Sequence, residues 1–292
     1  MKILITGASG FIGQNLISNL LKKNHKVSII TRKLSNVKKF KWSSKVEIFE
    51  KNLNFLNKKD YHKFSSNDVV IHLAWDGLPN YNDKIHFENY KISLDFIKKI
   101  IDLGIKHLII TGTCFEYGLQ NGCLKEHGKT NPKNNYGLAK ENLRREIFTY
   151  SKKKKIIIKW ARLFYLYGKG QNKKSLIGQL EEKIRNKEKN FFMSKGDQLR
   201  DYMNIKDVCK RICKLVENDY INGVVNICSN KPITVENLVL KYLKNKKKNI
   251  KLIKGYYKYN SYEPMNFWGH SKYFDSKGNI KKKYENIHIK PN

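Results

Sequence analysis

The stretch TGASGFIG, residues 6–13, directly follows a short apolar run at residues 2–6 and opens an amphipathic segment. Its glycines, Gly7, Gly10 and Gly13, follow the spacing GxxGxxG. Glycine at these places allows a tight turn, close approach of the backbone to a pyrophosphate and close packing of a helix against a strand. The start of that helix supplies amide donors and the positive end of its dipole. A strand, a glycine loop and a helix in this order predict a dinucleotide-binding fold.

Strand-like and helix-like segments alternate through the first half of the 292-residue chain. Apolar runs predict strands at 2–6, 26–31, 45–49, 68–74, 107–111 and 156–160, and amphipathic stretches such as Phe11–Lys23 and Phe87–Leu103 lie between most of them. This alternation indicates right-handed crossovers and a parallel sheet that helices cover on both faces. The predicted fold class is therefore α/β, a Rossmann-type doubly wound parallel sheet with a smaller C-terminal substrate-binding lobe.

The second half of the chain has a looser pattern. It still predicts helices at Ser175–Lys187, Lys206–Glu217 and Val235–Leu243 and a strand at Gly223–Ile227. We expect a Rossmann domain that binds NADP to consist of residues 1–164 with 201–228. We expect the lobe that binds the substrate to consist of residues 165–200 with 229–292.

The net charge of +34 argues less for nucleic-acid binding than its size suggests. Nucleic-acid readers favour arginine, because its fork makes bidentate contacts to phosphate and guanine. Only seven of the 59 basic residues are arginine, and lysine is spread from end to end. The composition therefore speaks against nucleic acid as a partner, while the charge favours attraction of polyphosphate ligands.

The five cysteines, at positions 114, 123, 209, 213 and 228, form no CxxC pair. This pattern predicts reduced, structural thiols and no metal site. No apolar stretch approaches the roughly 20 residues that span a bilayer, and the chain opens on a strand rather than on a secretory signal. We therefore expect a cytoplasmic protein without a membrane partner.

The second predicted strand ends in Thr31-Arg32-Lys33. A Rossmann site that uses NAD usually places an acidic side chain here, on the ribose 2′-hydroxyl. A hydroxyl and two cations suit a 2′-phosphate instead, so the sequence favours NADP(H), with NAD(H) as the alternative. Arg32 could also be a plain surface cation in this lysine-rich chain.

Several segments together resemble the extended short-chain dehydrogenase/reductase family, the nucleotide-sugar epimerases, dehydratases and reductases. The likeness covers nearly the whole chain and rests on TGASGFIG (6–13), HLAW (72–75), YGLAK (136–140), RLFYLYGKGQ (162–171) and QLRDYMNIKDV (198–208). Tyr165 and Lys169 depart from the asparagine and proline of the family pattern, so we expect rearranged contacts to the substrate diphosphate. The stretch EPMNFWG (263–269) resembles, more weakly, the tail of bacterial deoxysugar reductases of surface-polysaccharide pathways.

A catalytic triad follows from this resemblance and from chemistry. Hydride exchange at a secondary alcohol or ketone also requires a proton to move at oxygen, which a tyrosine can do if its pKa falls towards neutrality. Lys140 lies one helical turn from Tyr136 and would stabilise its phenolate and hold the cofactor ribose. Thr113, where the family has a catalytic Ser or Thr, would bond the same substrate oxygen. A Tyr136 that merely caps a helix is the structural alternative.

The remaining candidate contacts complete the expected site. The candidate cofactor-binding residues are Gly7, Ser9, Gly10, Phe11, Ile12, Gly13, Thr31, Arg32, Lys33, Asn52, Leu53, Leu73, Ala74, Trp75, Asn89, Thr111, Tyr136 and Lys140. The candidate substrate-binding residues are Thr113, Cys114, Phe115, Tyr165, Ser175 and Arg200. Arg200 would hold the nucleotide-sugar diphosphate, or else pair with Asp201 or Asp197. Family members often dimerise through the two helices that carry the equivalents of Asn89 and Tyr136, so the resemblance implies a homodimer.

The segment TGTCFEYG, residues 111–118, separates the reactions that this family performs. Dehydratases of the family carry Asp-Glu where this chain has Cys114 and Phe115, and the epimerase–reductases of GDP-fucose synthesis carry a cysteine at the position of Phe115. Phenylalanine can fill neither role. Glu116 on an extended strand would point away from Phe115 and act as a structural hydrogen bonder. The segment therefore favours hydride transfer alone.

We accordingly expect NADPH-dependent reduction of the 4-keto group of a nucleotide-linked (6-deoxy)hexose for surface-polysaccharide sugar synthesis. A nucleotide-sugar 4-epimerase with retained NAD is the enzymatic alternative. An alternative of another class is a non-catalytic sensor or scaffold that binds NADP or RNA.

Overall fold

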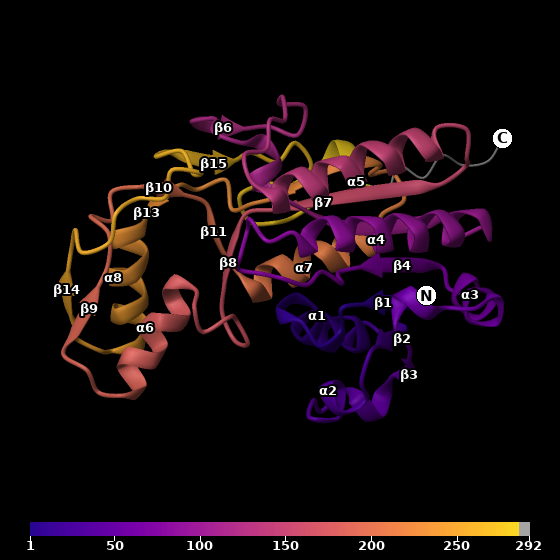
Figure 1. Cartoon of the computed structure of the whole chain (residues 1–292), viewed down its shortest axis with the longest axis horizontal. Helices are drawn as coiled ribbons and strands as arrows, with labels where there is room; N and C mark the ends of the chain where they lie inside the picture. Colours follow the sequence, from indigo (N-terminus) through magenta and orange to yellow (C-terminus); the bar gives the residue numbers. More distant parts are fainter. Residues whose placement is uncertain (286–292) are drawn as a thin grey trace.

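A seven-stranded parallel sheet forms the centre of the computed structural model, which describes residues 1–285 (Figure 1). In spatial order its strands are β12 (Gly223–Ile227), β7 (Ile157–Leu163), β5 (His107–Thr113), β4 (Val69–His72), β1 (Lys2–Thr6), β2 (Lys26–Thr31) and β3 (Glu47–Glu50). The strand order reverses between β1 and β4. In open α/β sheets a ligand crevice forms at such a switch point, at the carboxyl ends of the strands.

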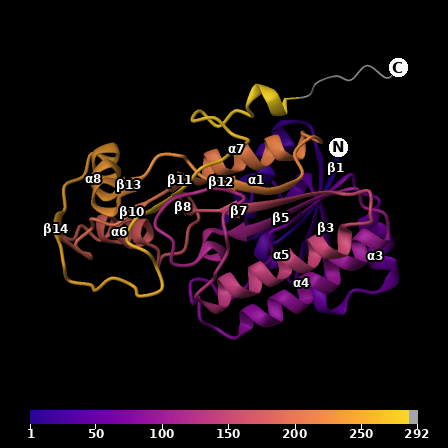
Figure 2. The ribbon, with the colours of Figure 1, turned by 90° about the horizontal axis from the view of Figure 1, so that it is seen from above.

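Helices cover both faces of this sheet (Figure 2). One face carries α1 (Phe11–Lys22) and α7 (Ile205–Val216), and the other carries α3 (Lys58–Ser65), α4 (Ile85–Asp102) and α5 (Asn135–Ser151). Successive strand residues pack on opposite faces of the sheet. Ile3 and Ile5 belong to the core under α1 and α7, whereas Leu4 belongs to the core under α3, α4 and α5. Since successive side chains point to opposite faces, apolar runs are buried throughout.

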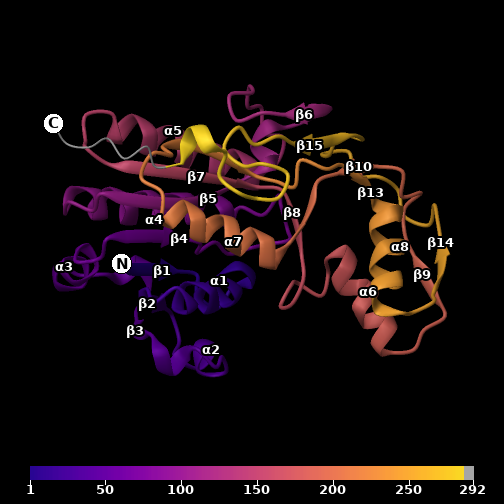
Figure 3. The same ribbon diagram turned by 180° about the vertical axis from the view of Figure 1, so that it is seen from behind.

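A smaller lobe lies beyond the carboxyl ends of the strands (Figures 1 and 3). It contains α6 (Leu176–Arg185), α8 (Val235–Lys246), the strand pair β9 (Asn190–Phe192) with β14 (Lys251–Ile253), and the pair β10 (Leu199–Arg200) with β13 (Ile233–Thr234). Its own core includes Leu180, Phe191 and Val239. The strands β8 (Tyr165–Tyr167) and β11 (Tyr202–Asn204) pair where the chain passes between the two parts.

The end of the described chain returns to the main domain, which the sequence did not predict. Strand β15 (Phe267–Gly269) pairs with β6 (Gly122–Leu124), and Tyr273 and Phe274 are buried in the core beneath α1 and α7. This lysine-rich tail has weak periodicity, so its sequence pattern does not indicate which of its aromatic residues are buried. The expected lobe boundary of 229–292 stays a prediction, and its residues 286–292 lie outside the described part of the chain.

The predicted α/β class is confirmed, and most elements lie where the sequence indicated. Strands β1, β2 and β12 have the predicted bounds, whereas β5 extends to Thr113. Helix α3 was not predicted, although Asn57 and Asp60 form a capping box at its start, a pattern visible in the sequence. A short helix, α2 (Ser35–Lys38), follows β2. Within residues 1–285, no helix is both long and apolar enough to cross a membrane.

Candidate active site

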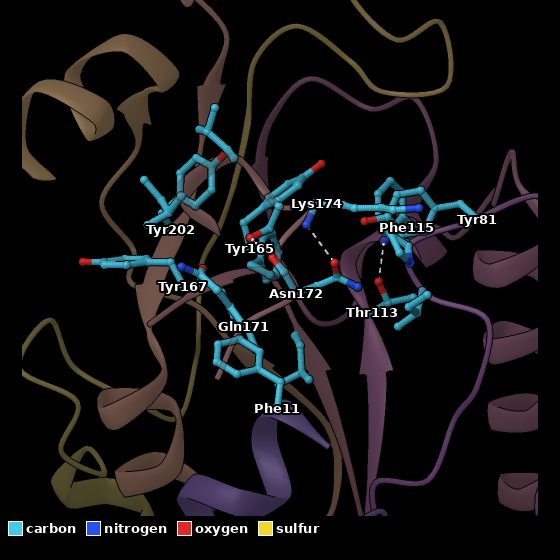
Figure 4. A pocket seen from close by; sticks show the side chains of 18 of the residues that line it. Phe11, Tyr81, Thr113, Phe115, Tyr165, Tyr167, Gln171, Asn172, Lys174 and Tyr202 are labelled. Carbon is cyan, nitrogen blue, oxygen red and sulfur yellow. Dashed lines mark hydrogen bonds between the residues drawn. The ribbon is translucent and has the colours of Figure 1, made fainter. Parts of the chain in front are cut away.

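A cavity of about 1170 Å³ opens at the carboxyl ends of the strands, between the sheet and the lobe (Figure 4). The glycine loop, the ends of β4 and β5, the start of α5 and the 171–175 segment all line it. Its size exceeds that of a typical small-ligand pocket and accommodates a dinucleotide beside a second ligand.

The glycine loop fits a dinucleotide pyrophosphate. Gly7 has a φ of +73°, and a Cβ at this position would lie 2.6 Å from the backbone nitrogen of Ala74. A Cβ on Gly13 would lie 2.4 Å from the carbonyl oxygen of Gly7. Helix α1 begins at Phe11, and its N-cap, Gly10, has no side chain that could occupy the first amides. Those amides border the cavity and are free to bind an anion.

The expected cofactor contacts divide into two groups. The cavity is lined by Gly7, Gly10, Phe11, Ile12, Gly13, Leu73, Trp75, Thr111, Tyr136 and Lys140. Other described candidates lie outside its lining: Ser9, Thr31, Arg32, Lys33, Asn52, Leu53, Ala74 and Asn89. Asn89 exchanges hydrogen bonds of 3.1 and 3.3 Å with the backbone of Asp76, so it fixes the loop after β4.

Arg32 at the end of β2 makes a bidentate ion pair with Asp76. Its Nη1 lies 2.7 Å from Oδ2 and its Nη2 3.0 Å from Oδ1 of that carboxylate. The Thr31 hydroxyl donates to the carbonyl oxygen of Lys33. Both partners of the ion pair are substantially exposed, so a competing phosphate can reach the guanidinium.

The segment after β5 differs from the expected extended strand. Cys114–Tyr117 forms a single 3₁₀ turn, in which the Thr113 hydroxyl accepts from the amide of Phe115 at 3.3 Å (Figure 4). Thr113 and Glu116 form a capping box across this turn. Thr113, Cys114 and Phe115 all line the cavity, as expected for substrate contacts. The turn forms because the small, hydroxyl-bearing Thr113 satisfies the amides at its start.

Glu116 is fully buried and structural, as the sequence indicated, although the reason is the turn and not a strand. It accepts hydrogen bonds from the amide of Thr113 at 2.7 Å, from the indole of Trp160 at 3.0 Å and from Nε of Arg162 at 2.7 Å. Arg162 also lies 3.9 Å from Glu141 on α5. This buried charge network fixes the turn that presents Thr113 and Phe115 to the cavity.

Tyr136 and Lys140 lie one turn apart at the start of α5 and are both buried. Nζ of Lys140 donates to the carbonyl of Thr111 at 2.8 Å and lies 3.7 Å from the centre of the Trp75 ring. Burial lowers the pKa of Lys140 to about 7. Burial raises the pKa of the Tyr136 phenol well above the ordinary value, and the nearby Thr113 hydroxyl lowers that pKa by a smaller amount. Lys140 lies one helical turn away, and its stabilisation of a Tyr136 phenolate stays a prediction.

His86 is a titratable group near Tyr136 that the sequence did not single out. Its ring centre lies 5.2 Å from that of Tyr136. Nδ1 accepts from the Trp75 indole at 3.0 Å, and Nε2 donates to the carbonyl of Asn80 at 2.8 Å. Burial lowers the pKa of His86, so the imidazole is neutral with both nitrogens engaged. It holds Trp75 in place and is not poised to transfer a proton.

Aromatic side chains form one wall of the cavity beside Tyr136 (Figure 4). Tyr81 lies 4.6 Å from Phe115 and 5.9 Å from Tyr136, measured between ring centres. Tyr165 contacts Phe115 on its other side at 6.2 Å and Tyr202 at 5.3 Å. The sequence singled out neither Tyr81 nor Tyr202 as a cavity residue, because tertiary packing alone brings their loops together.

The expected diphosphate ligand Arg200 lies behind this wall rather than in the cavity lining. It is 1% exposed and forms an ion pair with Glu263 at 3.0 Å. Its Nη1 donates to the carbonyl oxygens of Leu199 and Met265. The partner is thus Glu263, and neither Asp197 nor Asp201. Glu263 itself borders the cavity, a position that its sequence context did not reveal.

The segment before α6 supplies polar groups at the lobe side of the cavity. Ser175 lines the cavity, as expected, and caps α6 by accepting from the amide of Gly178 at 3.2 Å. Gln171, Asn172 and Lys174 lie beside it (Figure 4). Lys174 places a cation in the cavity near the lobe.

Two of the five cysteines lie on helix α7. Cys209 and Cys213 are buried in the core with α1 and α7. Burial raises the pKa of both thiols to about 12. Across the part of the chain that the structure describes, no group of three or more His, Cys, Asp or Glu side chains is arranged to hold a metal ion.

These features define a Rossmann-type fold in which a glycine loop and a Tyr–Lys pair line one cavity at the carboxyl ends of the strands. The chain belongs to the NAD dependent epimerase/dehydratase family, whose sequence model matches residues 3–228. It is an NAD(P)-dependent oxidoreductase of that family. Both statements agree with the resemblance drawn from its motifs.

The chain is similar to individual proteins whose names describe enzymes of nucleotide sugars. It is 28% identical over 271 residues to the dTDP-6-deoxy-L-talose 4-dehydrogenase (NAD(+)) of Aggregatibacter actinomycetemcomitans, covering 92% of this chain and 99% of that protein. It is 27% identical to the dTDP-4-dehydro-6-deoxyglucose reductase of Escherichia coli, covering 84% and 82% of the two chains. A UDP-N-acetylglucosamine 4-epimerase structure from Methanobrevibacter ruminantium M1 shares the fold, with a TM-score of 0.80, 22% identity and coverage of 93% and 89%.

Proposed function

We propose that this protein reduces the 4-keto group of a nucleotide-linked (6-deoxy)hexose with NADPH. The observation that carries the proposal is the surroundings of the Tyr136 phenol. The Thr113 hydroxyl lies near that phenol, Phe115 packs against the Tyr136 ring at 6.3 Å between ring centres, and His86 has both nitrogens engaged. Hydride transfer to a ketone requires one proton at oxygen, whereas elimination or epimerisation next to a ketone also requires a base at carbon.

Tyr136 is suited to act as the proton donor in this direction. Burial raises its pKa, so the phenol holds its proton at neutral pH. A bound NADPH supplies the hydride for the ketone carbon. The Tyr136 hydroxyl would then donate its proton to the oxygen of that ketone, with the Thr113 hydroxyl orienting the same oxygen. Lys140 would stabilise the resulting phenolate, and it lies next to Thr111 and Trp75 where it can also reach a ribose.

The aromatic wall supports a substrate with an apolar substituent. Tyr81, Phe115 and Tyr165 all line the cavity, and the rings of Tyr81 and Tyr165 both pack against Phe115. A methyl group at C6 of a 6-deoxyhexose packs favourably there, whereas a C6 hydroxyl would lose hydrogen bonds to water. The names of the relatives support the same substrate class, since they describe dehydrogenation or reduction at C4 of 6-deoxyhexoses.

The nucleotide end of the substrate would lie at the lobe. Lys174 and Lys258 border that side of the cavity and are cations that a diphosphate can approach. Ser175 and Gln179 add polar groups beside them. Whether Arg200 also contributes, as the sequence led us to expect, depends on its release from Glu263.

NADP(H) preference is part of the proposal and rests on the end of β2. No carboxylate stands in Thr31-Arg32-Lys33, and the Arg32 fork already holds an anionic group, the Asp76 carboxylate. A 2′-phosphate would take over that fork with the same bidentate geometry. We further propose a cytoplasmic homodimer that associates through α4 and α5 and serves surface-polysaccharide synthesis.

One assay tests the reaction. Purified protein is incubated in deuterium oxide with NADPH and a panel of nucleotide-linked 4-keto sugars, and the nicotinamide absorbance is followed. We expect one NADPH consumed per product and no deuterium at C3 or C5. Deuterium at either carbon would show a base at carbon, for which Glu263 would be the first candidate. Turnover of a 4-hydroxy sugar without net NADPH consumption would establish the 4-epimerase instead.

A further inference from the structure

A second cavity, of about 410 Å³, lies between helix α7 and the loop after Phe274. The segments that enclose it lie side by side in two views of the molecule (Figures 2 and 3). Its lining comprises Tyr167, Tyr202, Met203, Asn204, Asp207, Lys210, Arg211, Lys214, Ser229, Lys231, Ser276, Lys277, Gly278 and Asn279. None of these residues belongs to the candidate catalytic or cofactor-binding set.

The lining of this cavity is strongly cationic. It contains Arg211 and four lysines, at positions 210, 214, 231 and 277, against the single carboxylate of Asp207. That carboxylate is engaged by Lys210 at 3.2 Å. Lys214 donates to the carbonyl of Gly278 and to the side chain of Asn279. Among the interactions of residues 1–285, the ammonium groups of Lys231 and Lys277 have no carboxylate within ion-pair distance. The cavity therefore carries an excess positive charge.

Arg211 distinguishes this cavity from ordinary lysine-rich surface. It is only 4% exposed, and no described carboxylate forms an ion pair with it. Nη1 donates to the carbonyl of Cys228 at 2.6 Å, whereas Nε is buried with no partner. The guanidinium stands over the Phe274 ring at 5.1 Å. Asp201, Asp207 and Asp275 act on this guanidinium only from beyond ion-pair distance. A buried guanidinium without a carboxylate in direct contact is costly unless another anion binds it.

The backbone of the opposing loop leaves room for this guanidinium. Gly278 has a φ of +81°, and a Cβ there would lie 3.2 Å from Nε and 3.5 Å from Nη2 of Arg211. A larger residue at position 278 would press on the arginine. The loop thus approaches Arg211 closely without supplying it with a hydrogen-bond acceptor.

We propose that this cavity is a second anion-binding site, for a ligand that carries a phosphate group. Phosphate offers several acceptor oxygens to a guanidinium fork and to surrounding ammonium groups. The ligand is either inorganic phosphate or a small phosphorylated metabolite, since the volume exceeds that of a single phosphate.

Occupancy of this site would act on the substrate cavity through a shared wall. Tyr167 and Tyr202 line both cavities. They belong to the paired strands β8 and β11, in which Tyr202 lies directly opposite Tyr165 of the aromatic wall. A ligand that draws Arg211 and Lys231 together would therefore change the affinity of the main cavity for its own ligand.

Calorimetric titration of the full-length protein with inorganic phosphate tests the proposal. The titration is run at constant ionic strength and saturating NADPH, so that the glycine loop is occupied. We expect saturable binding that Arg211→Gln weakens by about tenfold or more, the usual effect of losing a charge-assisted hydrogen bond. A parallel titration with glucose 6-phosphate distinguishes inorganic phosphate from a phosphorylated metabolite as the ligand. The ligand class that the site selects should have the lower dissociation constant.

Two further variants keep the test decisive if Arg211→Gln does not fold. The double variant Lys231→Ala/Lys277→Ala removes the unpaired lysines of the cavity. The control Lys152→Ala/Lys153→Ala removes two exposed lysines after α5. We expect weakened phosphate binding only in the first. Equal weakening in both, no saturable binding, or phosphate that competes with NADPH would overturn the proposal.

Discussion

Arg200 and Glu263 form a buried ion pair, with Nη2 and Oε2 3.0 Å apart. Their side chains are 2% and 11% exposed, respectively. Arg200 also donates to the carbonyls of Leu199 and Met265, so the pair ties strand β10 to the segment before β15. The Glu263 carboxylate borders the substrate cavity, so the pair both supports the lobe and sets the charge of the cavity wall.

Removing one partner of this pair should destabilise the fold. Arg200→Met leaves the Glu263 carboxylate largely buried and unpaired, so we expect a loss of about 3–5 kcal/mol in the free energy of unfolding. Arg200→Met/Glu263→Leu should recover most of this loss, because both charges are gone. Denaturant unfolding of the wild type, both single variants and the double variant completes the cycle. A single variant as stable as the wild type would contradict the prediction.

The same double variant tests whether Arg200 holds the substrate diphosphate. If the arginine is only structural, the stable double variant should bind nucleoside diphosphates at least as tightly as the wild type, because it also loses the negative charge of Glu263 from the cavity wall. Loss of binding, measured by calorimetry, would instead support the contact that the sequence suggested.

Tyr136→Phe should abolish most of the turnover without loss of cofactor affinity. The phenol is the proton donor of the proposed reaction, and general acid catalysis contributes about a hundredfold to ten-thousandfold to a rate. Steady-state kinetics measures kcat, and dinucleotide fluorescence measures binding. Tyr150→Phe on the same helix, whose hydroxyl bonds Asp102, is the matched control. Unchanged biological activity in Tyr136→Phe would favour the sensor or scaffold.

Arg32→Asp should weaken NADPH binding and leave NADH binding little changed. The change removes a charge-assisted donor and adds repulsion, so we expect a loss of about 1.5–3 kcal/mol, tenfold to a hundredfold or more. Asp76→Asn should have the opposite effect, because it frees the Arg32 fork. Arg185→Asp is the control, since Arg185 is similarly exposed and also paired. Equal losses of affinity for NADPH and NADH, or a wild-type preference for NADH, would contradict the proposed NADP(H) preference.

Acid should destabilise the protein through His72. This residue is fully buried, lies within 2.9 Å of Thr6 and Ser93, and burial lowers its pKa to about 3. The unfolded chain binds a proton near pH 6.5, so the stabilisation is complete above that pH and is lost as the pH falls towards 3. In this pH range, the expected loss in the free energy of unfolding is about 1.4 kcal/mol per pH unit.

The His72 effect is separable from other acid effects by substitution. Between pH 7.5 and pH 5, the free energy of unfolding should fall by about 2 kcal/mol less in His72→Gln than in the wild type. Denaturant unfolding at both pH values measures this difference. The exposed His62→Gln serves as control and should follow the wild type. Parallel pH profiles for His72→Gln and the wild type would contradict the assignment.

Local patterns account for the parts of this protein that the sequence predicted. Buried parallel strands require continuous apolar runs, and the glycine loop requires its spacing whatever surrounds it. Tyr136 and Lys140 meet because they share one helical turn. The sequence alone therefore determined the sheet, the glycine loop and the Tyr–Lys pair.

Only the tertiary structure decided which residues pair with the candidate ligand-binding arginines. Arg200 meets Glu263 across 63 positions, and Arg32 meets Asp76 across 44. The raised pKa of Tyr136 likewise depends on how deeply the phenol is buried. Side-chain type shows that an arginine needs an anion, but it does not show which anion. Chain folding selects that anion, because the contact depends on how remote loops pack and not on any local period.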